Sequence, residues 1–171
     1  MKQIMSGQKF ARIMQYLHVC SLYKQIGQEY NPSYKVQELL GSLHKQFHQL
    51  FQLGQQLSLD ETLIQSFGRI KFKVCIISKA AQYGIKIYVL TDAATAHVLK
   101  VIVYTGKHTY NESVNQADKK TVRVVKDLCK SWEGTHCIVY VDSYYTLLEL
   151  LKELHKMKLY VTVGDQILED H

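Results

Sequence analysis

The stretch LSLDE at residues 57–61 opens a series of short segments that decide the fold. Each segment is rich in β-branched and aromatic residues and is bounded by turn-forming residues, which is the pattern of β-strands. We therefore predict a strand at 57–61 and at five further places: GRIKFKV (68–74), GIKIYVL (84–90), HVLKVIVY (97–104), HCIVYVD (136–142) and LYVTV (159–163).

Helical periodicity occurs before this series and between its last members. Residues 7–18 and 35–52 carry apolar side chains at the i, i+3, i+4, i+7 spacing of one helical face. Residues 118–131 predict a third helix, with Val122, Val125, Leu128 and Cys129 on its inward face, and residues 145–157 predict a fourth. Strands that first follow one another and then alternate with helices indicate an α/β fold, in which helices flank a sheet of mixed direction.

Length and composition set the class of protein. The chain has 171 residues, of which 47% are hydrophobic and 21% charged, and these values exclude a disordered chain. We expect an N-terminal helical segment at 1–56 and the sheet-containing core at 57–171. No apolar run approaches the ~20 residues that span a bilayer, and the N-terminus lacks a secretory signal pattern, so no membrane partner is expected. The four cysteines form no C-x-x-C pair, which favours reduced thiols inside the cell.

The net charge of +6 is unevenly distributed along the chain. Residues 61–110 carry 7 basic and 2 acidic residues, whereas residues 111–171 carry 8 basic and 10 acidic ones. A basic middle part favours a polyanion partner such as nucleic acid. The alternative is an ordinary solvated surface on a mildly basic protein.

Two aspartates follow apolar strand segments. Asp60 ends LSLD and Asp142 ends CIVYVD, so each is expected at the rim of the sheet, where ligand sites of α/β proteins gather. Two carboxylates on neighbouring strands repel each other unless a cation lies between them, and oxygen ligands suit Mg²⁺ or Mn²⁺. The alternative is that each aspartate forms a turn or caps a helix, which suits Asp142 because Ser143 and a predicted helix follow.

Glu61 and Asp92 are weaker candidates for the same metal site. Glu61 is expected on the opposite strand face from Asp60, so it is not expected to share the site. Asp92 also ends a strand segment, and we predict that it forms a turn.

A row of basic residues lies within residues 68–74. If this segment is extended, Arg69, Lys71 and Lys73 share one face, because side chains alternate along a strand. Such a row offers positive charge to phosphates without reading sequence. The alternative is an edge strand that lysines protect against aggregation.

Other motifs are absent or weak. His44 and His48 lie four residues apart on a predicted helix, but no Glu follows His44, so they are predicted to lie on a solvent-facing flank. The chain has no nucleotide-binding glycine motif and no G-x-S-x-G sequence.

The order of short motifs carries a family resemblance over nearly the whole chain. The chain resembles the transposase domain of the piggyBac family, including the piggyBac transposable element-derived proteins. The motifs that carry the resemblance are Ser58-Leu59-Asp60-Glu61, Gly68-Arg69, Gln82-Tyr83-Gly84-Ile85-Lys86, Leu90-Thr91-Asp92, Tyr104-Thr105-Gly106 and Val141-Asp142-Ser143-Tyr144-Tyr145-Thr146.

The resemblance implies a fold, a chemistry and a set of partners. The family has an RNase H-like core, similar to that of retroviral integrases, in which three aspartates (a DDD motif) hold divalent metal for DNA nicking and strand transfer. Asp60 and Asp142 match the first and second aspartates. The third follows well beyond the second in the family and has no match in this sequence, so we expect an incomplete triad and an RNase H-like sheet that is incomplete at the C-terminus. Double-stranded DNA as partner, a nuclear location and a possible homodimer also follow from the resemblance.

The resemblance also assigns the basic block and shows where the chain departs from the family. Lys79 and Lys86 join Arg69, Lys71 and Lys73 as predicted DNA-binding residues. Ser143 replaces the asparagine that follows the second aspartate in the family. We therefore expect a transposase-derived, domesticated domain that is inactive as an enzyme and keeps weak, non-specific DNA binding. The alternatives are a fragment of an active transposase, and a protein-interaction module that keeps the fold without a DNA role.

Overall fold

A computed structural model describes residues 5–17, 19–20, 31–51, 54–77, 79, 82–109, 117–145, 148–163 and 166–168. Three short 3₁₀ helices occupy Gly106–Thr109, Lys130–Trp132 and Ser143–Tyr145. The longer elements are, in chain order, α1 (Gly7–Tyr16), α2 (Tyr34–Leu50), β1 (Gln56–Gln65), β2 (Val74–Cys75), β3 (Tyr83–Asp92), β4 (Val98–Val103), α3 (Ala117–Cys129), β5 (Ile138–Val141), α4 (Leu148–Lys156), β6 (Tyr160–Val163) and β7 (Gln166–Leu168).

The described strands form one mixed sheet of seven strands, in the order β2-β3-β1-β5-β6-β7, with β4 also paired to β3. β3 is antiparallel to each of its neighbours, β1, β2 and β4, and β7 is antiparallel to β6. β5 is parallel to both β1 and β6. The predicted mixed sheet, with helices beside it, is therefore confirmed.

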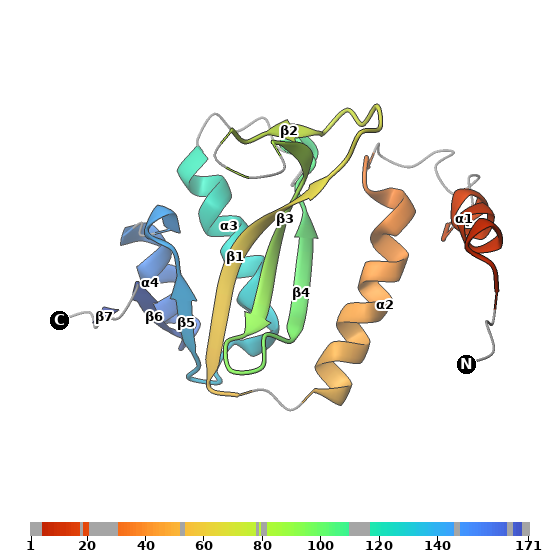
Figure 1. The fold of residues 1–171 in the computed structure, drawn as a ribbon. Coiled ribbons are helices and arrows are strands. Elements are labelled where there is room, and N and C mark those ends of the chain that lie inside the picture. The colour runs from red at the N-terminus through yellow and green to blue at the C-terminus, as the bar shows by residue number, and fades with distance from the viewer. Residues whose placement is uncertain are drawn as a thin grey trace.

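Helices α3 and α4 supply apolar side chains to the core. The predicted inward residues of α3 are all buried (Val122, Val125, Leu128 and Cys129), as are Leu150 and Leu154 of α4. They join Leu57, Leu59, Val139 and Val141 of β1 and β5 in one hydrophobic cluster. Figure 1 shows α2 beside the edge strand β4 and α1 farther from the sheet. No helix in the described part of the chain is long and apolar enough to cross a membrane.

The predicted strand at 68–74 is wrong for most of its length. The backbone turns there, because the Ile70 amide bonds to the Gly68 carbonyl and the Lys73 amide to the Ile70 carbonyl. These local bonds replace a strand ladder, and only Val74–Cys75 pairs with β3. The exposure of side chains still alternates along the segment as predicted.

Strand β1 is longer than predicted. Its antiparallel pairing with β3 runs from Leu57 to Gln65. Asp60 therefore lies within a continuous strand, although the parallel pairing of β1 with β5 extends only to Leu59. The prediction that a strand ends at Asp60 is therefore correct for the pairing of β1 with β5 and wrong for its pairing with β3.

His44 attaches α2 to the sheet, which corrects its prediction as a solvent-facing residue. Its Nε2 accepts a hydrogen bond of 3.0 Å from the amide of Val101, on edge strand β4. Burial lowers the pKa of His44, the nearby Lys100 lowers it further, and Asp127 opposes both. The acceptor role needs the neutral imidazole, so the packing of α2 depends on pH.

We predict that this contact weakens in acid. Because the pKa of His44 is lowered in the folded chain, the unfolded chain binds more protons, and stability is lost as pH falls below the ordinary histidine pKa of about 6.5. His44→Gln keeps an acceptor that does not titrate, so its urea midpoint should fall less than that of the wild type between pH 7.5 and 5. His155→Gln, at an exposed position of α4, serves as the control and should follow the wild type.

We predict that Gly84→Ala destabilises the sheet. A Cβ at Gly84 would lie 2.3 Å from the carbonyl oxygen of Ile64, because β1 and β3 approach closely there. Forcing backbone apart in a packed region costs about 2–3 kcal/mol, which urea unfolding would measure. Gly41→Ala is the matched control: it meets nothing within 4 Å. It should stabilise α2 by about 0.5–1 kcal/mol, because alanine favours helix over glycine. Equal effects of the two substitutions would contradict the prediction.

Candidate functional site

The sheet brings Asp60 and Asp142 side by side. β1 and β5 run parallel, and the last pair in their register is Leu59 with Val141. Asp60 and Asp142 are the next residue on each strand path. Leu59 and Val141 are buried, so strand alternation directs both aspartates to the opposite face, where both are exposed.

Local hydrogen bonds engage one oxygen of each carboxylate. Asp60 Oδ1 accepts a bond of 2.7 Å from the Glu61 amide. Asp142 Oδ1 accepts from the amide and the hydroxyl of Ser143, at 2.6 and 3.2 Å. Asp142 thus bonds to Ser143, the first residue of the 3₁₀ helix Ser143–Tyr145, whereas a cap of α4 stays a prediction. These hydrogen bonds do not exclude metal binding, because they use only the Oδ1 atom of each aspartate.

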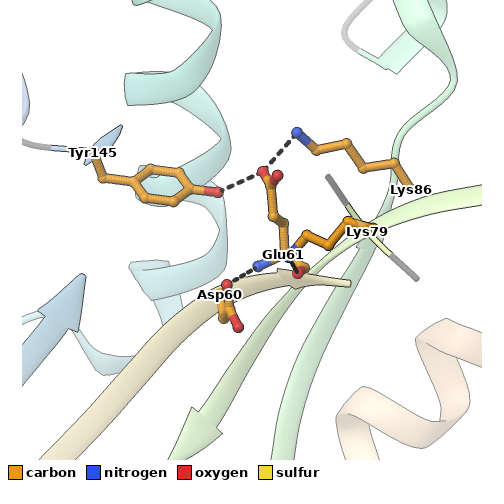
Figure 2. A network of polar contacts seen from close by, with 5 residues as sticks. All are labelled: Asp60, Glu61, Lys79, Lys86 and Tyr145. Carbon is orange, nitrogen blue, oxygen red and sulfur yellow. Dashed lines mark hydrogen bonds and ion pairs between the residues drawn. The ribbon is translucent and has the colours of Figure 1, made fainter. Parts of the chain in front are cut away.

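A polar network lies behind Asp60 (Figure 2). Glu61 Oε2 lies 2.6 Å from Lys86 Nζ and accepts a hydrogen bond of 3.3 Å from the Tyr145 hydroxyl. Lys79 Nζ donates to the Glu61 carbonyl oxygen at 3.4 Å. Lys86 Nζ also lies 5.0 Å from the ring centre of Tyr88, within cation–π range. Glu61 therefore joins β1, β3 and the segment after β5.

The predicted DNA-binding residues fall into two groups. Arg69, Lys71 and Lys73 are exposed in the turn before β2. Lys73 Nζ lies near the Gly68 carbonyl and over the Tyr83 ring. Lys79 and Lys86 instead contact Glu61, and the Lys86 side chain is only 16% exposed. DNA contact stays a prediction for all five, and the exposed three are placed best for it.

Asp92 lies near the start of β1, three residue positions before Asp60. β3 runs antiparallel to β1, so Asp92 pairs with Leu57. Its buried carboxylate accepts bonds from the Thr95 amide and hydroxyl, both at 2.8 Å, and from the Gly54 amide at 3.1 Å. Burial alone would raise the pKa of Asp92, but these bonds outweigh it and hold that pKa below its usual range. The prediction of a turn role is confirmed.

The link between Glu61 and Tyr145 is what sequence reasoning missed. Tyr145 comes three residues after Asp142, and Glu61 one residue after Asp60. Their contact depends on the register of β1 against β5, which the motifs themselves do not contain. No group of three or more His, Cys, Asp or Glu side chains that could hold a metal ion occurs among the residues the structure describes.

Comparison with known proteins assigns the family. A family model described as Transposase IS4 matches residues 1–164. The chain belongs to this transposase family.

One solved transposase structure has a closely similar fold, and a second matches more distantly. A piggyBac transposase synaptic complex with hairpin DNA matches with a TM-score of 0.79 and 25% identity, over 95% of this chain and 34% of that one. The Mos1 transposase paired-end complex with the left transposon end matches with a TM-score of 0.39 and 13% identity, over 90% and 49%. The family model and the piggyBac match confirm the piggyBac resemblance and the RNase H-like core. The chain spans about a third of the piggyBac transposase it matches.

Proposed function

We propose that this chain is the part of a piggyBac-type transposase core that binds divalent metal and the DNA backbone. The observation that carries the proposal is the register of β1 and β5, which sets Asp60 beside Asp142 in a chain with a transposase fold. The name of the matched structure, a complex with hairpin DNA, supports DNA as the partner. As parts of the same proposal, a DNA partner supports a nuclear location for this chain. The synaptic complex named in the matched structure supports a homodimer.

The two carboxylates fit a hard divalent cation. Both are exposed on one face of the sheet, and neither forms an ion pair with another residue in the described part of the chain. Their like charges therefore favour a cation between them, and oxygen donors select Mg²⁺ or Mn²⁺. Asp60 and Asp142 would hold the ion. Such an ion, when bound, polarises a phosphoryl oxygen and lowers the pKa of water.

We further propose that Asp60 and Asp142 do not complete strand cleavage by themselves. Two-metal phosphoryl transfer uses a clamp that stabilises both the attacking and the leaving oxygen. A single pair of carboxylates supplies too few oxygen ligands for two ions that each prefer six. The proposed activity of this chain is therefore metal binding at Asp60 and Asp142, together with DNA binding by its basic residues and without cleavage, as in a domesticated transposase-derived protein.

Contact with DNA is proposed for the exposed turn before β2. Arg69, Lys71 and Lys73 present three cations there, within the block of residues 61–110 that carries a net charge of +5. Cations on an exposed turn neutralise phosphates and release counterions, without reading base sequence. Binding of this kind is weak at physiological salt.

We predict that Mn²⁺ binding depends on both aspartates. Asp60→Asn and Asp142→Asn should each weaken Mn²⁺ binding at least about tenfold, because loss of a ligand costs no less than loss of an outer-shell partner. Titration by electron paramagnetic resonance measures the affinity. Glu149→Gln removes an exposed negative charge from α4 and is the control that should bind as the wild type does. An unchanged affinity in Asp60→Asn would refute the proposed site.

We predict that binding to duplex DNA is strongly salt-dependent. Replacing Arg69, Lys71 and Lys73 together with Gln should reduce the slope of log affinity against log salt by about 3, if each contacts one phosphate. Fluorescence anisotropy with duplexes of two unrelated sequences measures the slope. The matched control replaces the exposed Lys9, Lys35 and Lys152 with Gln, which removes the same charge elsewhere and should change the slope less.

The same measurement separates the alternatives. Absence of duplex binding at low salt would refute the DNA proposal and favour a fold kept for protein contacts. Metal-dependent nicking of the duplex would refute the proposal of binding without cleavage and favour a fragment of an active transposase.

A further inference from the structure

We propose that Tyr145 and Glu61 are positioning residues that fix the placement of Asp142 relative to Asp60. The inference rests on the proposed metal role of the two aspartates, and it assigns a purpose to the polar network behind them. Neither residue is proposed as a metal ligand. Their effect is transmitted through the backbone segments that carry the aspartates.

The hydrogen bonds form a continuous path between the aspartates. Asp60 Oδ1 accepts from the Glu61 amide, and Glu61 Oε2 accepts from the Tyr145 hydroxyl. The Tyr145 amide in turn donates to the Asp142 carbonyl oxygen at 2.9 Å. Because the register of β1 and β5 extends only to Leu59 and Val141, this path holds the aspartates just where strand pairing stops.

Burial gives the path its rigidity. Tyr145 is 2% exposed, so its ring is fixed by the core and its hydroxyl needs a partner within the protein. Burial and the charge of Glu61 raise the pKa of Tyr145, so the hydroxyl stays protonated and donates at neutral pH. Figure 2 shows the hydroxyl reaching Glu61 from the side opposite Lys86.

Lys86 pairs with Glu61 and orients its carboxylate. The Glu61 side chain is 22% exposed, and a half-buried carboxylate is costly without a partner. Lys86, which also lies over the Tyr88 ring, supplies that partner at 2.6 Å. Strand alternation directs Glu61 to the face opposite Asp60, so Glu61 acts through Tyr145 and not on the metal.

The test is Mn²⁺ affinity in variants that keep the site carboxylates. Tyr145→Phe removes one hydroxyl without changing charge, and should weaken Mn²⁺ binding about threefold to tenfold, the equivalent of one hydrogen bond. Tyr160→Phe, on the exposed face of β6, is the matched control and should bind as the wild type does. Each chain is first shown to be folded at the titration temperature by circular dichroism, so that a change in stability alone does not alter the affinity.

A second pair of variants covers the case in which Tyr145→Phe does not fold. Glu61→Gln and Glu61→Met both remove the charge, but only Gln keeps an oxygen that can accept from Tyr145. The inference requires weaker Mn²⁺ binding in the Met variant than in the Gln variant. Equal loss in both would overturn it and would indicate that the charge of Glu61 is what matters.

The outcomes separate this inference from the proposed function. If the wild type binds no Mn²⁺, or if Asp60→Asn binds it unchanged, the proposed metal role fails and the inference fails with it. If Asp60→Asn loses binding while Tyr145→Phe binds as tightly as the wild type, only the positioning role is overturned.

Discussion

The parallel pairing of β1 with β5 is the constraint on which the site depends. It aligns Leu59 with Val141 in the core and, one residue further, sets Asp60 beside Asp142 on the opposite face. The alignment is enforced by burial, because a slip of one residue would turn the apolar residues to solvent and the aspartates into the core. The burial that stabilises the core therefore also holds two like charges side by side, where the proposed cation would relieve their repulsion.

The fold separates basic residues of the segment 61–110 into half-buried and exposed ones, which a count of charges does not show. Residues 61–110 carry a net charge of +5, which at the level of sequence is one polyanion-facing feature. In the fold, Lys86 forms an ion pair with Glu61, whereas Arg69, Lys71 and Lys73 lie at the surface. A cation that compensates a half-buried carboxylate contributes to the stability of the site and is poorly placed for a phosphate. The surface proposed for DNA binding is therefore narrower than the sequence suggests.

Much of the fold and of the aspartate pair could be predicted from the sequence, because both rest on local periodicity. The inward face of α3 and the placement of Asp142 at the end of a buried strand are examples. The errors on the length of β1 and on His44 share one cause: the residues of a segment do not show which other segment it will pack against. β1 continues past Asp60 because β3 accompanies it, and His44 has a role only because β4 is an edge strand. Gly68–Lys73 has strand-like alternation but bonds locally instead.

The neighbours Asp60 and Glu61 show how one step along a strand changes the role of a carboxylate. Alternation sends Asp60 to the exposed face, while Glu61 enters a protected setting with Lys86 and Tyr145. The first has the charge and access that a metal ligand needs. The second is paired with Lys86 and has a fixed orientation, which suits a residue that positions others. In the proposed site the two adjacent acids therefore have different roles on opposite faces of β1. Asp60 would bind the metal, and Glu61 would fix the segment after β5 through its hydrogen bond with the Tyr145 hydroxyl.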